Sequence, residues 1–247
     1  MIKTHLNDFQ SISLNDMDNV KLMNRVDTKF VFNENKLVEL LSSLKNHYDI
    51  LDINNQRVHS YKSLYYDTID YKFFRHHHNG RVNRNKVRFR EYVGSGLSFL
   101  EIKTKNNKGK TNKNRIKVES ITDVLSTSDK EYIDSVIGKK LELESKQWVC
   151  FDRFTLVDKD AKERLTIDTN IVFNNTTQNG SFENIVIAEL KQDRLNNASK
   201  FKRLAKNMYI SPSNLSKYCL STISLKPDIK QNIFKEKLLL LNKLKQQ

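Results

Sequence analysis

Residues 86–91 read KVRFRE, residues 99–105 read FLEIKTK and residues 112–118 read NKNRIKV. Charged and apolar side chains alternate in all three stretches. Successive residues of a strand point to opposite faces, so Arg88 and Arg90 share one face and the apolar residues take the other. The three stretches therefore predict consecutive antiparallel strands with one charged face and one apolar face.

The rest of the chain shows similar strands, with helical periodicity mostly near its two ends. Strands are expected at residues 25–33, 60–68, 84–93, 97–105, 111–119, 147–159, 162–173 and 182–191. Helices are expected at residues 11–24, 34–46, 129–140, 196–207, 213–224 and 228–245. About eight strands in this arrangement favour an antiparallel α+β fold over a βαβ fold.

Most of the predicted strands carry a charged face. A charged face on one strand usually meets solvent. Over six or seven strands, however, like charges would lie side by side, which is destabilising unless an anion lies between them. A sheet closed into a barrel, with basic side chains inside and helices packed outside, accommodates both faces. Glu101 and Glu189 share the charged face and would suit a divalent cation that bridges phosphate oxygens.

Composition narrows the choice of partner. The 247 residues include 43 Lys and Arg against 29 Asp and Glu, for a formal charge of +14. Such an excess points to nucleic acid, an anionic membrane or a polyphosphate-bearing substrate.

No apolar stretch is long enough to cross a bilayer, and the N-terminus lacks the apolar core of a signal peptide. Two cysteines without paired spacing support no disulfide framework, so a cytoplasmic location is expected.

Nine segments, taken together and in order, resemble the VTC domain (vacuolar transporter chaperone type), the polyphosphate polymerase branch of the triphosphate tunnel metalloenzymes. The segments read RVDTKFVF, LYYDT, KVRFREY, FLEIKTK, KNRIKV, CFDRFTL, ERLTIDTNIVF, IAELK and NLSKY. The resemblance implies a single tunnel domain over residues 1–247, with its core at about 24–224 and a C-terminal helix at 228–247. It also implies transfer of the γ-phosphate of ATP onto polyphosphate, with Mn²⁺ or Mg²⁺.

The resemblance also assigns roles to individual residues. Seven would act on the reacting phosphates: Lys29, Arg88, Arg90, Lys103, Arg153, Arg164 and Lys191. Four more would bind phosphate: Lys113, Arg115, Ser216 and Lys217, the last two at the start of a C-terminal helix. Glu189 would bind the metal, and Asp168 would orient a neighbouring arginine.

One departure from the wider superfamily bears on the reaction. Hydrolytic tunnel enzymes start with Glu-x-Glu-x-Lys, whereas residues 25–29 read RVDTK, which replaces one metal ligand by a phosphate contact. This favours phosphoryl transfer along polyphosphate. The alternatives are a triphosphatase for inorganic or nucleoside triphosphate and a non-catalytic polyphosphate-binding module. Nucleic acid is not expected, because no recognition helix or RNP-like aromatic strand occurs. A membrane-protein partner for the product stays open.

Several conspicuous residues are given structural roles. The run His76–His78 is expected in a loop or at a helix end rather than as a metal site, since consecutive side chains point in different directions. Tyr66, Phe89 and Trp148 are expected in the core or the wall, and Cys150 and Cys219 as buried apolar residues. The last helix is amphipathic and is expected to dock on the body, with a partner as the alternative.

Overall fold

The computed structural model describes residues 2–18, 26–107, 111–160, 162–193 and 199–247. Its central feature is an antiparallel path of eight strands in the order β2-β11-β9-β8-β4-β5-β6-β7. The eight strands are β2 (Val26–Asn33), β4 (His59–Asp67), β5 (Arg84–Tyr92), β6 (Leu97–Lys105), β7 (Thr111–Val118), β8 (Glu144–Asp158), β9 (Glu163–Asn174) and β11 (Ile185–Gln192). They correspond to the eight predicted strands, so the antiparallel α+β fold is confirmed.

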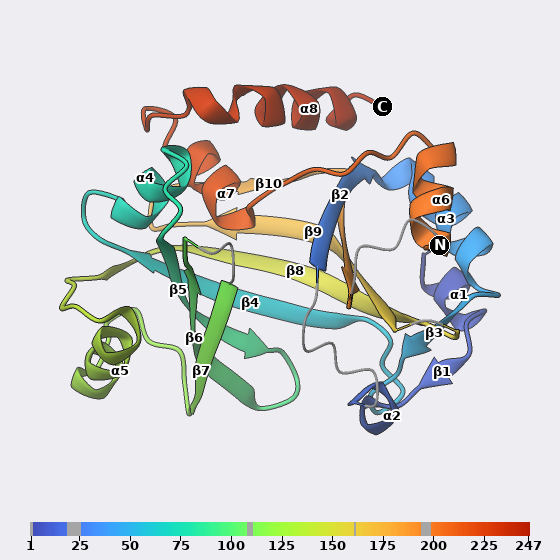
Figure 1. The fold of residues 1–247 in the computed structure, drawn as a ribbon, viewed down its shortest axis with the longest axis horizontal. Coiled ribbons are helices and arrows are strands. Elements are labelled where there is room, and N and C mark those ends of the chain that lie inside the picture. The colour runs from blue at the N-terminus through green and yellow to red at the C-terminus, as the bar shows by residue number, and fades with distance from the viewer. Residues whose placement is uncertain (1, 19–25, 108–110, 161, 194–198) are drawn as a thin grey trace.

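Helices lie around this sheet (Figure 1). They are α1 (Ile2–Asn7), α2 (Leu14–Asp18), α3 (Leu37–Leu44), α4 (Lys72–His78), α5 (Thr127–Ile137), α6 (Lys200–Asn207), α7 (Lys217–Leu225) and α8 (Lys235–Lys245). The helix expected over residues 11–24 is wrong at its start, where β1 (Ser11–Ile12) pairs with β3 (Tyr48–Leu51). Its last residues lie outside the described ranges. No helix of the described ranges has the length and apolar character needed to span a membrane.

The sheet curls without closing through backbone hydrogen bonds. Among the described residues, β2 and β7 are the two ends of the path and do not pair with each other. The second edge of β2 instead meets the segment before α7, through a bridge between Phe30 and Pro212 and a hydrogen bond of 2.7 Å from Ser213 N to Lys29 O. The expected barrel is therefore an open, curved sheet, because another segment occupies the edge that closure would need.

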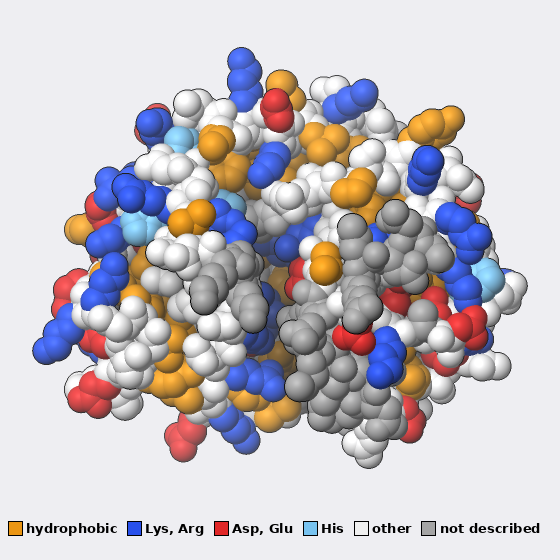
Figure 2. All heavy atoms as spheres, viewed as in Figure 1, with side chains coloured by type: hydrophobic (Ala, Val, Ile, Leu, Met, Phe, Trp, Pro, Cys, Tyr) orange, Lys and Arg blue, Asp and Glu red, His pale blue; other side chains and the backbone are white. Residues whose placement is uncertain are grey.

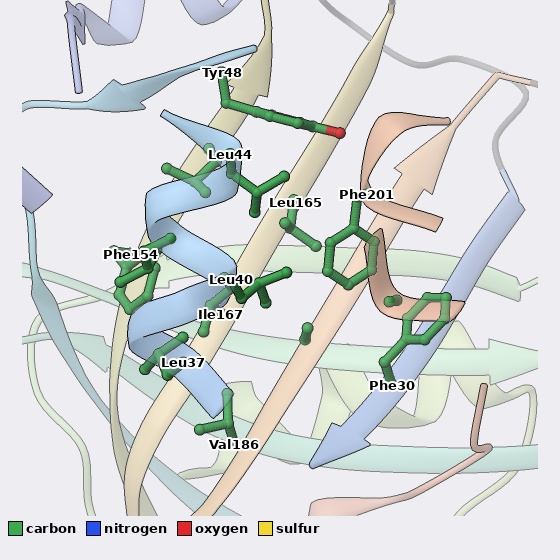
Figure 3. Packing of buried hydrophobic residues seen from close by; sticks show 14 of the residues in the cluster. Phe30, Leu37, Leu40, Leu44, Tyr48, Phe154, Leu165, Ile167, Val186 and Phe201 are labelled. Atoms are coloured by element: carbon green, nitrogen blue, oxygen red, sulfur yellow. The ribbon is translucent and has the colours of Figure 1, made fainter. Parts of the chain in front are cut away.

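The outer face of β2, β11, β9 and β8 is covered by α3 and α6 (Figure 3). Leu37, Leu40 and Leu44 recur at helical spacing, so all three point toward the strands and none is exposed. Phe201 of α6 packs edge-on against Phe30, with ring centroids 4.9 Å apart. This layer leaves the opposite, charged face of the same strands directed into the curve.

The outer face of β5 and β6 forms a second core under α5. Tyr66 and Phe89 are buried there, as predicted, and Trp148 packs against it partly buried. Cys219 is buried in a different cluster, whereas Cys150 is half-buried rather than fully buried. Because β5 presents Phe89 outward, its intervening arginines must point inward.

One helix packs on the inner face, which the sequence did not predict. Apolar residues of β8 and β11, including Phe151 and Ile187, meet Leu215 and Cys219 at the start of α7. The sequence predicted helices outside the sheet and at the C-terminus, and α7 is one of the C-terminal helices; it packs on the inner face because part of that face is apolar. Phe234 at the start of α8 joins the same cluster, so the last helix docks on the body as expected.

A buried carboxylate joins α4 to α7. Asp67 at the end of β4 accepts hydrogen bonds from the backbone N–H groups of Phe73 (2.8 Å) and Phe74 (2.9 Å). It also accepts one from the hydroxyl of Tyr218 at 2.6 Å. Burial raises the pKa of Asp67, which these hydrogen bonds oppose. The two helices that flank the start of β5 are thus held in a fixed relation.

Candidate functional site

Strands β5, β6 and β7 bring their charged side chains to one face. Residues opposite each other in an antiparallel pair have side chains on the same side of the sheet. The register joins Lys86, Lys103 and Lys113 in one row and Arg88, Glu101 and Arg115 in the next. The side chains selected by alternation in single strands therefore form one surface across three strands.

Strands β2, β11, β9 and β8 form a second charged group. The register pairs Lys29 with Glu189, Lys191 with Arg164, and Asp168 with Arg153. These pairs lie on the inner face, opposite the apolar layer under α3 and α6.

The two groups face each other across the curve. In a flat sheet, the five strand steps from β11 to β6 would separate their side chains by about 24 Å. Burial lowers the pKa of Lys103 on β6, and the carboxylate of Glu189 on β11 opposes that fall, so the sheet must curl to bring the two together. Figure 2 shows this face hollowed near its middle, with Lys and Arg side chains visible inside the hollow.

Glu101 is the carboxylate of the first group. Its side chain is inaccessible to solvent and accepts hydrogen bonds from Nη2 (2.6 Å) and Nε (2.9 Å) of Arg88. Lys113 forms an ion pair with its other oxygen. Burial opposes ionisation, but the charges of Arg88, Arg90 and Lys113 hold the pKa of Glu101 well below its usual range. Glu101 therefore bridges Arg88 and Lys113, with one carboxylate oxygen toward each cation.

Asp168 plays the same part in the second group. It accepts hydrogen bonds from Nε (2.5 Å) and Nη2 (2.8 Å) of Arg153 and forms an ion pair with Lys217. This matches the expectation that Asp168 orients a neighbouring arginine. Lys217 also lies 4.4 Å from the ring centroid of Phe151. Its neighbour Ser216 caps α7 by accepting from Cys219 N at 3.3 Å, so the start of this helix faces the cationic interior.

Glu189 lies between two lysines. One oxygen is 3.2 Å from Nζ of Lys29, and the other pairs with Lys191. Burial opposes ionisation, yet Lys191 and Lys29 hold the pKa of Glu189 well below its usual range. In the described part of the chain, no three His, Cys, Asp or Glu side chains converge on one point. One ionised carboxylate fits Mg²⁺ or Mn²⁺ only when phosphate oxygens and waters complete the shell.

Three cations of the interior form no ion pair with a carboxylate among the described residues, although the charges of Glu101 and Glu189 act on Arg90 and Lys103 from further away. Arg90 donates to Oγ of Ser63 at 3.1 Å and Lys86 to Oγ of Ser216 at 2.9 Å. Lys103 makes no hydrogen bond or ion pair there. Burial lowers the pKa of all three groups, that of Arg90 to about 10. A buried cation without a counter-ion is costly, so this surface is suited to an added anion.

Aromatic rings complete the wall. Tyr61 and Phe151 stack with centroids 5.3 Å apart, and Arg90 and Arg153 lie against both rings. The hydroxyl of Tyr65 accepts from Nη1 of Arg88 at 2.9 Å. These contacts fix the guanidinium planes, which favours bidentate binding of an oxyanion.

The remaining predicted residues are placed less deeply. Arg115 lies on the exposed edge strand β7, 4.6 Å from the ring centroid of Phe99. Arg164 is half-buried beside Lys191. Residue 25 lies outside the described ranges. The run His76–His78 ends α4, as expected.

Sequence reasoning missed Lys86 and Tyr65 as members of the interior. Lys86 precedes Arg88 by two residues, so the same alternation that found Arg88 could have found it. Tyr65 is opposite Arg88 on β4, and only the strand pairing reveals that.

A cavity of about 580 Å³ lies elsewhere, between β2 and α6. Thr28 and Phe30 line it, and they point away from the face that carries Lys29. It is therefore separate from the cationic interior.

Comparison with known proteins agrees with this geometry. The family model of the VTC domain matches residues 24–226. The chain belongs to the VTC domain family. No curated protein sequence matches this VTC domain.

A solved structure shares this fold. The Hippeastrum protein HpAC1, whose structure is described as revealing a dominant triphosphatase activity, matches with a TM-score of 0.52 and 13% identity. The match covers 81% of the VTC domain chain and 96% of that protein. PH1819 from Pyrococcus horikoshii OT3 matches with a TM-score of 0.45 and 11% identity, over 81% of this chain and 98% of that one.

Proposed function

We propose that this VTC domain transfers the γ-phosphate of ATP onto the end of a polyphosphate chain inside the cationic interior, with the help of a divalent metal. The observation that supports it best is the trio Lys86, Arg90 and Lys103. Arg90 is buried and the two lysines are half-buried, and none of the three forms an ion pair with a carboxylate among the described residues. They lie beside cations that are already neutralised, so the interior as a whole needs further negative charge. A chain of phosphates supplies that charge in a linear form.

The chemistry requires position and charge more than a reactive side chain. An oxygen of the terminal acceptor phosphate is already ionised and attacks the γ-phosphorus in line. The bond from that phosphorus to the bridging oxygen of ADP breaks, and ADP leaves with the electron pair. Arg88, Arg90 and Lys103 face the equatorial oxygens, where charge gathers in the transition state. Glu189 would hold Mg²⁺ or Mn²⁺, which supplies further charge neutralisation at phosphate oxygens.

A triphosphatase is the second candidate. The structural likeness to the Hippeastrum protein favours it, since that structure is described by its dominant triphosphatase activity. The same cations would then serve, with water in place of the acceptor phosphate. The sequence RVDTK at residues 25–29 favours the polymerase instead.

Product analysis separates the two. The protein is incubated with ATP and Mn²⁺, long polymer is resolved on a gel stained for polyphosphate, and ADP and free phosphate are measured. ADP with long chains supports the polymerase. ADP with an equal amount of free phosphate and no chains supports the triphosphatase. Binding of triphosphate without turnover would leave only a binding module.

Two variants test the assignment of the interior. We expect Lys103→Ala to lower turnover by about 10²–10³-fold, because it removes one transition-state contact. Lys117→Ala changes the charge equally on the exposed strand β7 and should leave turnover within about twofold. Full activity in Lys103→Ala would show that this face does not carry the reaction.

A further inference from the structure

Strand β5 carries a row of four cations that continues beyond the residues of the proposed reaction. Arg84, Lys86, Arg88 and Arg90 are two residues apart, so all four side chains leave the strand on the same face. Two residues of a strand advance about 7 Å, so the row is about 20 Å long. Arg90 is buried, while Arg84 is half-buried at the start of the strand. The row therefore leads from the interior to its mouth.

At the mouth, a cation from another element joins the row. The pKa of His77, at the end of α4, is lowered to about 3, first by burial and then by the charges of Lys86, Arg84 and Lys237. The same three cations oppose the burial that raises the pKa of Cys219 in α7. The same three cations therefore act on the pKa of a group in α4 and on that of a group in α7.

The position of Lys237 agrees with this. Lys237 is in the first turns of α8, and its ammonium lies 5.6 Å from the ring centroid of Phe234. That ring in turn lies 6.0 Å from the ring of His77. Figure 1 shows the start of α8 above α4 and α7, and Figure 2 shows Lys, Arg and His side chains gathered on that side of the molecule.

The mouth differs from the interior in its charge balance: among the described residues, Arg84, Lys86 and Lys237 form no ion pair with a carboxylate. Inside, Glu101, Asp168 and Glu189 each bridge two cations. The charges that most affect the pKa of His77 and of Lys86 belong to groups other than carboxylates. Within the described ranges, Arg84 and Lys237 form no ion pair with Asp or Glu. Three like charges without an acid repel one another, and an anion between them removes that repulsion.

Lys86 connects this cluster to the interior. Its Nζ donates to Oγ of Ser216, the residue that caps α7, at 2.9 Å. The charge of Lys29, which faces the interior, also acts on it. An anion that spans both regions must therefore be long and charged along its length. A small ion would bind in only one of the two regions, so it would not require that Lys86 connect them.

We propose that Arg84, Lys86 and Lys237 form an outer phosphate subsite. It binds a stretch of a long inorganic polyphosphate chain while the end of that chain lies among Arg88, Arg90 and Lys103. The subsite rests on the proposed function in one respect, namely that the interior holds phosphates. It adds where the chain leaves the interior: between β5 and the helices α4, α7 and α8.

The test compares a short and a long ligand. Inorganic triphosphate fills only the interior, whereas long-chain inorganic polyphosphate also reaches the mouth. Titration calorimetry at fixed salt gives Kd for both ligands with the wild type and with Arg84→Gln/Lys237→Gln. We expect Kd for long-chain polyphosphate to rise at least about tenfold, about 1.4 kcal/mol. Kd for triphosphate should stay within about twofold.

A charge-matched control removes the general effect of net charge. Lys235→Gln/Lys243→Gln alters two exposed lysines on the same helix α8. It should change Kd for the long chain by less than about threefold. An equal loss in this control, or an equal loss for triphosphate in the test variant, would mean a diffuse field rather than a subsite, and would overturn the proposal. So would no loss at all in the test variant.

The outcomes also separate this inference from the proposed function. If the wild type binds neither ligand, the interior does not hold phosphates and both fail. If triphosphate binds the wild type but the long chain is insensitive to Arg84→Gln/Lys237→Gln, only the outer subsite fails. Thermal unfolding of each variant checks that the fold is retained, which we expect because neither side chain is buried.

Discussion

Replacement of Arg90 by methionine should stabilise the ligand-free protein while it weakens phosphate binding. Arg90 is buried at 7% exposure, and its pKa is lowered to about 10, first by burial and then by Arg88. A cation whose pKa falls on folding destabilises the folded state at any pH below the folded value, so the full cost applies at pH 7. Methionine carries no charge, and its flexible apolar side chain fills the part of the space that the aliphatic stem of Arg90 occupies.

The size of the effect follows from the contacts of Arg90. Burial of a guanidinium that is only partly neutralised costs about 3 kcal/mol. The variant also loses the hydrogen bond to Ser63, worth about 1 kcal/mol, and the contacts with the rings of Tyr61 and Phe151, together about 1 kcal/mol. The net gain is about 1 kcal/mol, or about 2–4 °C in Tm for a chain of this size.

Urea and thermal unfolding in phosphate-free buffer measure this gain. Addition of inorganic triphosphate should raise the Tm of the wild type more than that of Arg90→Met, since the variant has lost a phosphate contact. Lys117→Met is the control: it lies in the same row of the sheet but is exposed, and should change the unfolding free energy by less than about 0.5 kcal/mol. Destabilisation of Arg90→Met by 1 kcal/mol or more without ligand would refute the idea that the interior stores unfavourable charge.

Three further predictions concern the carboxylates. Asp168→Asn leaves Arg153 and Lys217 without their shared counter-ion and should lower the unfolding free energy in urea by about 3 kcal/mol. The pKa of Glu101 lies below its usual 4.5 in the folded chain, so its contribution to stability is complete above that pH and is lost as the pH falls further. Glu101→Gln should therefore flatten the acid side of a plot of unfolding free energy against pH, and an unchanged slope would contradict this. With Glu189→Gln, added Mn²⁺ should no longer stimulate turnover at any concentration, because the metal ligand is lost. Triphosphate should still bind to this variant without metal, which calorimetry with EDTA checks.

Strand alternation was sufficient to identify the inward face. A period of two fixes which side chains share a face, so Arg88, Arg90 and Lys103 could be grouped before any strand was paired. The same rule would have included Lys86, which is the second residue before Arg88. The alternation therefore contains enough information to place Lys86 on the inward face.

The pairing of charges could not be predicted in the same way. That Lys113 shares Glu101 with Arg88 depends on the register of β7 against β6, and that Lys217 reaches Asp168 depends on where α7 packs. Both are set by tertiary contacts between segments far apart in the sequence. Helix α4 was missed for a local reason, since it follows Tyr71 in the left-handed conformation (φ 58°) and is only seven residues long.

The open edge of the sheet determines how the interior can respond to its contents. A closed barrel has a circumference fixed by a continuous ladder, and any widening breaks backbone hydrogen bonds. Here the described parts of β2 and β7 share no such bonds, so the two strands can separate without that loss. The width of the interior is then set by the balance between repulsion among its cations and attraction to the phosphates between them. An occupied interior should be narrower than an empty one.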